Sequence, residues 1–596
     1  AELAAAAAEA GHRVLRAEPG TEYASTDGTV VLDLADPEHH ARLLREAAAP
    51  GGSPVESTGP LRIVHTAAAT AAPTATADDP EPALDAGCHS LLRLAQAVAR
   101  ELPDRAVELV AATADVFDVL GGDGRDPVGA TVAGTCRGID QEYPRIRCRT
   151  VDLEAPAETA RAAAGQLLRE VELLAAGAGE PDTWLTAWRR GRRWLRTFTE
   201  VDLPSVEPER VWRPGGSYLV TGGLRGLGLL LATRLAPLRP KLTLVGRTEL
   251  PAEDDWDAWL AEHGHDDEVS AILLAVRELR AAGAEVLPLT ADVTSPEQAE
   301  RAVRTARERF GTLHGVVHAA GVPGGGPPHA RTRQLTADVL APKVRGTLAV
   351  AEALRDDPPE LLVLYSSSVG VLGWRGEGDQ AAANAFLDAF AASDVVTEKV
   401  ARRVVSVAWG PWRRGTRSEP DDPFLAEHLR RYRERYGITD DEGVDALTRV
   451  AAAGPAQVVV LTQPFAEVAE RVGVVAGAEV GHEPDAPAGP KHPRPDLRTP
   501  YLAPRTDTER RIAGVWQDYL GIDEIGVHDP FFDIGGTSMV ATAVVGGLGR
   551  TLGVDLGPAS LFDHPTVAEL AALIDGTDSP PEPERAGRGG RRRDRR

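Results

Sequence analysis

The sequence contains little methionine and little cysteine, and both shortages narrow the classes of protein to which it can belong. Its only methionine is Met539, so no initiating residue is present, and we interpret the chain as processed or cut from something longer. Its three cysteines, Cys88, Cys136 and Cys148, form no paired framework and no C-x-x-C motif. This pattern predicts free thiols in a reducing, cytoplasmic setting.

Long apolar runs and an excess of basic charge are also missing. No apolar run approaches the roughly 20 residues that span a bilayer, and the N-terminal AELAAAAAEAGHRV reads as an amphipathic helix without an export signal. The net charge of −24 disfavours a nucleic-acid surface. The acidic loop at 263–268, HGHDDE, offers too few ligands for a metal site. We therefore expect no membrane, nucleic-acid or metal partner.

What is present is a long alternation of strand-like and helical segments. Up to about residue 205, β-branched apolar runs at 61–68, 106–113 and 145–153 are separated by helical segments such as 90–102. This alternation predicts a parallel sheet covered by helices. The turn after the first run, HTAAATAAPT, has no glycine finger for a phosphate, so this half is expected to bind no nucleotide.

A second βα series begins at Gly216 and carries a glycine loop. Thr221, Gly222, Gly226 and Gly228 match the T-G-x-x-x-G-x-G fingerprint of short-chain dehydrogenases, which this segment resembles. The glycines allow a backbone turn close to a pyrophosphate at a helix N-terminus. The next strand-like run ends in Arg247, where an acidic residue would suit NAD and an arginine suits the 2′-phosphate of NADP.

Residues 361–390 resemble the catalytic stretch of polyketide synthase ketoreductases, which belong to the short-chain dehydrogenase/reductase family. The family pattern is a serine, a tyrosine thirteen residues later and an asparagine four residues after that. Here the serine is Ser367 and the asparagine is Asn384, but the tyrosine position holds Gln380. The resemblance also places the family's catalytic lysine at Lys343, one of only four lysines in the chain.

The resemblance assigns the tyrosine the role of proton donor to the substrate ketone. Glutamine does not titrate and cannot supply that proton, and general acid catalysis is typically worth about 10²–10⁴-fold in rate. We therefore expect an inactive or strongly impaired ketoreductase. Two alternatives stay open: an active reductase with an unusual donor, such as water held by Gln380 or the nearby Tyr365, and a structural domain without cofactor, in which Arg225 obstructs the pyrophosphate.

The segment at 509–553 resembles acyl and peptidyl carrier domains. Its core FFDIGGTS places the serine that receives 4′-phosphopantetheine at Ser538. A serine exposed at the start of a helix suits a phosphodiester, because free N–H groups and the helix dipole favour the negative charge there.

The resemblance implies an α/β fold of two Rossmann-like halves followed by a small four-helix carrier domain. The expected domains are a structural subdomain (1–205), a catalytic NADP-type subdomain (206–475), a Pro-rich linker (476–505), the carrier (506–575) and a disordered basic tail (576–596). Beside Lys343, Ser367, Gln380 and Asn384, the expected cofactor contacts are Thr221, Gly222, Gly223, Gly226, Leu227, Gly228, Arg247, Asp292, Val293, Ala319, Ala320 and Gly321 for NADPH, and Ser538 for phosphopantetheine.

The same resemblance implies the setting of the chain. It would be the ketoreductase–carrier end of a modular polyketide synthase, or of a hybrid with a peptide synthetase. Its expected partners are upstream ketosynthase and acyltransferase domains, a downstream module or release domain, a phosphopantetheinyl transferase and an acyl thioester substrate.

Overall fold

The structure is a computed structural model, and its contacts divide the chain into two compact units, Ala1–Val472 and Gly473–Arg596, which we describe separately. The described residues of the first unit are 2–26, 28–48, 60–70, 79–155, 160–176, 184–326, 328–393, 397, 399–415 and 423–472. Those of the second are 473–477, 493–495, 497, 499–520, 522–531, 534, 544–545, 548–549, 551–552, 554, 560–561 and 564–576.

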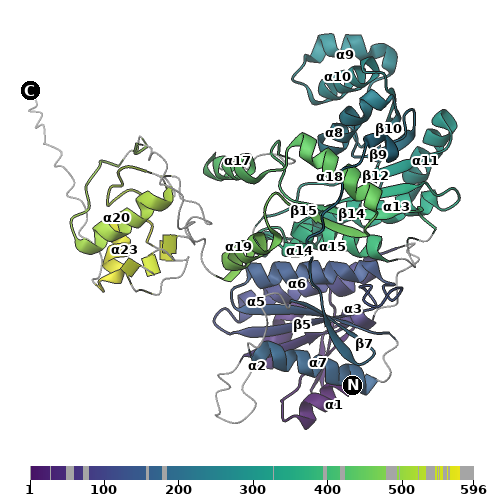
Figure 1. The fold of residues 1–596 in the computed structure, drawn as a ribbon. Coiled ribbons are helices and arrows are strands. Elements are labelled where there is room, and N and C mark those ends of the chain that lie inside the picture. Colours follow the sequence, from purple (N-terminus) through teal and green to yellow (C-terminus); the bar gives the residue numbers. More distant parts are fainter. Residues whose placement is uncertain are drawn as a thin grey trace, which may run out of the picture. The chain divides into compact units, whose positions relative to one another are not determined.

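The first half of the large unit is built on a five-stranded sheet in sequence order, from β4 to β8 (Figure 1). Its first four strands are parallel, and β8 returns antiparallel to β7 as an edge strand. The strands are β4 Leu61–His65, β5 Val107–Ala114, β6 Ile146–Leu153, β7 Leu185–Arg189 and β8 Arg192–Leu195, and the longer helices are α1 Glu2–Glu9, α2 Pro37–Ala48, α5 Ser90–Glu101, α6 Ala130–Glu142 and α7 Ala160–Ala175. A small sheet of order β1-β3-β2 comprises β1 Arg16–Pro19, β2 Ala24–Thr26 and β3 Thr29–Leu32.

The second half contains a seven-stranded parallel sheet of order β11-β10-β9-β12-β13-β14-β15. The chain order reverses between β9 and β12, the position at which doubly wound sheets bind ligands. The strands are β9 Ser217–Thr221, β10 Lys241–Gly246, β11 Glu285–Thr290, β12 Gly315–His318, β13 Leu361–Ser367, β14 Val404–Trp409 and β15 Gln457–Val460. The helices are α8 Gly226–Leu235, α9 Trp256–His263, α10 Glu268–Ala281, α11 Pro296–Phe310, α12 Arg333–Lys343, α13 Arg345–Leu354, α14 Val369–Leu372, α15 Gly378–Ala392, α17 Pro423–Tyr436, α18 Asp440–Ala453 and α19 Phe465–Gly477.

The central strands of the large sheet are mostly apolar because helices cover both faces. Every residue of β9, β12 and β14 is buried. The predicted α/β class with two Rossmann-like halves is confirmed.

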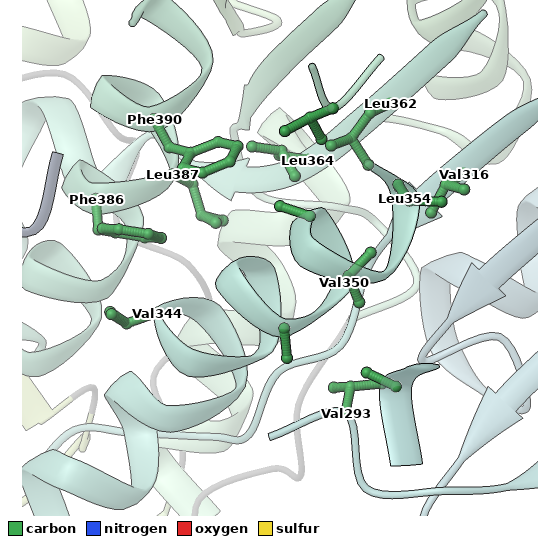
Figure 2. Close-up of a cluster of buried hydrophobic side chains, with 14 of the residues drawn as sticks. Val293, Val316, Val344, Val350, Leu354, Leu362, Leu364, Phe386, Leu387 and Phe390 are labelled. Carbon is green, nitrogen blue, oxygen red and sulfur yellow. The ribbon is translucent and has the colours of Figure 1, made fainter. Parts of the chain in front are cut away.

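Helix α15 lies at the centre of the large unit. Its residues from Gly378 to Ala391 are all buried. One face packs on the sheet and on α12, and there Phe386, Leu387 and Phe390 meet Leu364 and its neighbours (Figure 2). The other face packs against α6 of the first half, beside it in Figure 1. The many alanines of α15 follow from this position, since larger side chains would separate the two helices.

The cysteine prediction was wrong for two of the three residues. Cys136 on α6 and Cys148 on β6 form a disulfide, while Cys88 is free and buried. The short connection from α6 to β6 returns the chain along its own helix, so that the two Cα atoms lie 5.5 Å apart, which is within the range of disulfide geometry. Sequence spacing gave no sign of this approach.

In the small unit, α20 Asp507–Leu520 and α23 Val567–Ile574 pack together around an apolar core. Trp516 and Phe531 meet edge to face at its centre, with ring centroids 4.9 Å apart. Arg494 binds the buried Asp529 carboxylate through two nitrogens, at 2.6 and 2.7 Å. The expected four-helix arrangement lies partly outside the described residues. Ser538 also lies outside them.

Candidate active site

The glycine loop joins β9 to α8 at the carboxyl edge of the seven-stranded sheet. Gly222 has φ +66°, and a Cβ there would lie 2.7 Å from the Ala319 carbonyl oxygen, so a larger residue does not fit. A Cβ at Gly228 would lie 2.6 Å from the Gly222 oxygen. At Gly226, by contrast, a Cβ would meet no atom of the described chain within 4 Å. The N-terminus of α8 therefore offers open space and free N–H groups to an anion.

Two arginines occur at the carboxyl end of β10. Arg247 is exposed directly after the strand. Arg225, from the glycine loop, donates to the hydroxyl of Thr248 and pairs with the carboxylate of Glu268. Arg225 is thus turned toward the end of β10, where two guanidinium groups suit the 2′-phosphate of NADP.

The other predicted cofactor residues lie along the same edge. Asp292 follows β11, and its Oδ1 accepts from the backbone N–H and the hydroxyl of Thr294, at 2.9 and 2.8 Å. Val293 is buried in the main core, and Leu227 is half-buried at the start of α8. Gly223 packs on the Val220 carbonyl. Ala319, Ala320 and Gly321 follow β12.

A buried histidine connects this loop to Lys343. His318 Nε2 lies 2.9 Å from the carbonyl oxygen of Pro342, and Nδ1 lies 2.7 Å from the hydroxyl of Thr221. A carbonyl only accepts, so Nε2 carries the hydrogen and Nδ1 accepts from Thr221. Burial lowers the pKa of His318 to about 4 and keeps it neutral. Sequence reasoning missed this residue, which fixes the peptide directly before Lys343.

Three of the four predicted catalytic residues are joined by hydrogen bonds. Lys343 Nζ donates to Asn384 Oδ1 at 2.8 Å and to the Tyr365 carbonyl at 2.9 Å. Asn384 Nδ2 donates to the Gln380 carbonyl at 2.8 Å and faces Gln380 Oε1 at 3.4 Å. Gln380 Nε2 in turn donates to the carbonyl of Val322 at 2.9 Å. Gln380 therefore lies one turn before Asn384 on α15, and its side-chain amide is hydrogen-bonded within the protein.

Ser367 and Tyr365 lie on β13 but differ in environment. Ser367 is half-buried at the end of the strand, where its hydroxyl oxygen accepts from the Val369 N–H at 3.3 Å. Tyr365 is buried and packs edge-on against Trp409, with ring centroids 5.8 Å apart. Burial raises the pKa of the Tyr365 phenol above its ordinary value, which disfavours the ionised form that proton donation would leave.

One turn beyond Asn384, a second polar group is enclosed. Asp388 is buried, and its Oδ1 accepts from the Ser406 hydroxyl at 2.6 Å. Burial raises the pKa of Asp388 to about 6.

The first half of the chain contributes residues that sequence reasoning also missed. Glu142, at the end of α6, forms a buried ion pair with Arg331 through two bonds of 2.6 and 2.9 Å. The same carboxylate accepts from the backbone N–H groups of Gly376 and Gly378, at 2.9 and 3.2 Å. Glu142 thus fixes the N-terminus of α15 from the other half, a contact that no local sequence pattern could indicate.

No group of three or more His, Cys, Asp or Glu side chains suited to a metal occurs in the described part of the chain. In the same part, no helix combines the length and apolarity needed to cross a membrane.

The dinucleotide loop, the arginines and the Lys343–Asn384 pair are the features expected of the short-chain reductase fold. Comparison with protein families agrees, since residues 216–414 match the KR domain and residues 510–574 match the phosphopantetheine attachment site.

Two relatives illustrate the extent of the similarity. Polyketide synthase PksL of Bacillus subtilis is 28% identical over 464 residues, which are 74% of this chain and 9% of PksL. The 6-methylsalicylic acid synthase of Aspergillus terreus is 31% identical over 382 residues, 62% of this chain and 21% of that synthase. The chain thus spans only a small part of these relatives.

Solved ketoreductases share the fold. An A1-type ketoreductase aligns with a TM-score of 0.57 at 25% identity, over 74% of this chain and 86% of its own. An N-terminal ketoreductase from the macrolactin assembly line aligns with a TM-score of 0.58 at 21% identity, over 76% of this chain and 83% of that ketoreductase chain.

These findings identify the chain as a ketoreductase domain followed by a phosphopantetheine carrier domain, a module of the polyketide-synthase type. The ketoreductase family implies NADPH, and the residues at the glycine loop fit it. The carrier family implies 4′-phosphopantetheine.

Proposed function

We propose that this module holds an acyl chain as a thioester on a 4′-phosphopantetheine arm at Ser538 and leaves its β-keto group unreduced. The observation that supports it most directly is the state of position 380. Gln380 hydrogen-bonds Val322 and Asn384 in the place where the ketoreductase pattern requires a tyrosine. The lysine and asparagine that would assist a tyrosine are hydrogen-bonded to each other.

The chemistry requires two events at the ketone. NADPH, when bound, supplies the hydride to the carbonyl carbon. The protein must supply a proton to the oxygen, with Ser367 and Lys343 as donors of hydrogen bonds to the site. A serine hydroxyl and the amide of Gln380 are far weaker acids than a tyrosine phenol. Lys343 carries an acidic proton, but its Nζ donates to Asn384 and to the Tyr365 carbonyl. The reduction therefore lacks its acid, while the carrier keeps its FFDIGGTS motif.

The two alternatives have less support. Tyr365 is enclosed in the apolar core, so it is a poor substitute donor. Arg225 is paired with Glu268 and Thr248, and this pairing favours cofactor binding over obstruction. We further propose the usual neighbours of such a module as partners: ketosynthase and acyltransferase domains upstream, a module or release domain downstream, and a phosphopantetheinyl transferase.

The decisive experiment restores the acid. The chain is loaded on Ser538 with a β-ketoacyl pantetheine, and NADPH oxidation and the hydroxyacyl product are measured for the native chain and for Gln380→Tyr. We expect little reduction by the native chain and a gain of about 10²-fold or more for the variant, the range that general acid catalysis supplies.

The control is Ser538→Ala, which cannot be loaded and should show no reduction in either background. Rapid reduction by the native chain, unchanged by Gln380→Tyr, would contradict the proposal and favour an unusual proton donor.

A further inference from the structure

The segment Val322–Gly326, which follows β12, is held against the N-terminal end of α15. Gln380 Nε2 donates to the Val322 carbonyl at 2.9 Å, and Asp379 Oδ2 accepts from the Gly325 N–H at 3.0 Å. The Gly326 N–H donates to the Gly376 carbonyl at 3.0 Å. Three successive bonds thus attach this short segment to α15 and the turn before it.

The segment also fits closely against the two side chains that hold it. A Cβ at Gly324 would lie 2.8 Å from Asp379 Oδ2 and 3.0 Å from Gln380 Nε2. Gly325 and Gly326 have φ of +104° and +117°, values that residues with a side chain rarely adopt. The attached conformation therefore requires glycine at these three positions, both for space and for backbone conformation.

The far end of the segment is fixed by the Glu142–Arg331 pair. Arg331 donates to the Gly326 carbonyl at 2.9 Å. Because Glu142 also accepts from the Gly376 and Gly378 N–H groups, one buried ion pair positions both the segment and the α15 turn on which it rests.

The orientation of the Gln380 amide is set by a chain of donors. Lysine only donates, so Asn384 must present Oδ1 to Lys343 and Nδ2 to Gln380. The Gln380 Oε1 then faces Asn384, and its Nε2 faces Val322. Lys343 thus fixes the orientation of the Asn384 amide, and Asn384 fixes that of the Gln380 amide. As a result, the Gln380 NH₂ group, and not its oxygen, faces the segment.

We propose that Gln380 is a positioning residue for the segment Val322–Gly326: its amide latches the segment onto α15 and thereby closes the site to the β-ketoacyl thioester. The segment continues from Gly321, where a Cβ would lie 3.6 Å from Lys343 Cε, so the attached segment begins beside the side chain that the proposed function places at the ketone. Position 380 therefore carries an amide that holds the segment, where the family pattern has a tyrosine that donates a proton. The inference rests on the proposed function only in taking position 380 as the former place of the acid.

The test is Gln380→Met, which keeps length and volume but has no amide. Hydrogen exchange followed by mass spectrometry should show the Gly325 and Gly326 amides exchanging about tenfold faster than in the native chain, since local opening governs their protection. Binding of a soluble β-ketoacyl pantetheine thioester should tighten about tenfold, and NADPH affinity should not change. Methionine supplies no proton, so the result is independent of whether restoring an acid restores reduction.

The matched control is Gln141→Met. Gln141 is also a buried glutamine whose Nε2 donates to a backbone carbonyl, that of Leu372, at 2.8 Å. This variant should loosen the Leu372 turn and leave Gly325 and Gly326 unchanged. Gln380→Asn, whose shorter amide cannot reach Val322, should repeat the effect of Gln380→Met. Unchanged exchange at Gly325 and Gly326 in both variants at position 380, or unchanged thioester binding, would overturn the proposal.

Discussion

At the scale of single residues, the arrangement of the site depends on which atoms can donate hydrogen bonds. In the proposed function, Lys343 and Asn384 keep the arrangement that would support a proton donor, and Gln380 completes the chain of hydrogen bonds without supplying a proton. His318 has the same kind of role at the cofactor end, where one ring satisfies two buried groups. Because both of its nitrogens are used, neither phenylalanine nor a smaller amide can replace it without leaving a buried group unpaired.

We predict that His318→Phe weakens NADPH binding about tenfold and lowers the free energy of unfolding by about 1–3 kcal/mol, the cost of an unsatisfied buried acceptor. The Pro342 carbonyl and the Thr221 hydroxyl lose their partner, so the glycine loop and Lys343 are no longer connected. Titration followed by nicotinamide fluorescence and denaturant unfolding measure the two effects.

His314→Phe is the matched control for this prediction. His314 precedes the amino end of the same strand, where its Nδ1 accepts from the Ser217 N–H at 3.0 Å. Its loss should reduce stability while leaving NADPH affinity unchanged. Equal NADPH affinities of the native chain and His318→Phe would contradict the connection.

At the scale of elements, the contact between α6 and α15 explains why the two halves belong together. Glycines on α6 face the backbone of α15: a Cβ at Gly138 would lie 2.7 Å from the Gly378 Cα, and one at Gly134 would overlap the Ala381 carbonyl. Glu142, one turn beyond Gly138, then reaches the N-terminus of α15. The first half therefore holds α15 in place.

We predict that Gly134→Ala destabilises the large unit by about 1–3 kcal/mol, because the new methyl group meets backbone that cannot move aside. The opposite sign is expected for Gly165→Ala on α7, where a Cβ meets no described atom within 4 Å. There alanine should stabilise by about 0.5–1 kcal/mol through helix propensity. Thermal unfolding of both variants measures the difference, and equal shifts would show that the α6–α15 contact is looser than described.

At the scale of the whole molecule, the features that could be predicted from the sequence are those that depend on local patterns. Apolar runs rich in β-branched residues located β4, β5 and β6, because each signal lies within one segment. The family resemblance singled out Lys343, Gln380 and Asn384, and the fold joins these three residues by hydrogen bonds. Glu142, Arg331 and the Cys136–Cys148 disulfide could not be found in this way. They act between segments that the fold alone brings together.

Buried titratable groups determine how the stability of the large unit depends on pH. Burial lowers the pKa of His65, His89 and His318 to about 4, below the ordinary value of 6.5. These histidines take up protons on unfolding between pH 6.5 and 4, so their contribution to stability is complete above pH 6.5 and is lost as the pH falls. Asp388 acts in the opposite sense, because burial raises its pKa to about 6 and acid relieves that penalty.

We predict that the large unit loses stability between pH 7 and pH 5, by about 2 kcal/mol for each histidine less about 1 kcal/mol for Asp388. His89→Leu should make this dependence shallower, because neither His89 nitrogen has a hydrogen-bond partner among the described residues and the apolar side chain removes only the cost of protonation. Melting temperatures of both chains from pH 5 to 8 provide the measurement. Parallel curves for the two chains would show that His89 takes up its proton without global unfolding, through a local opening of the π-helix Asp85–His89.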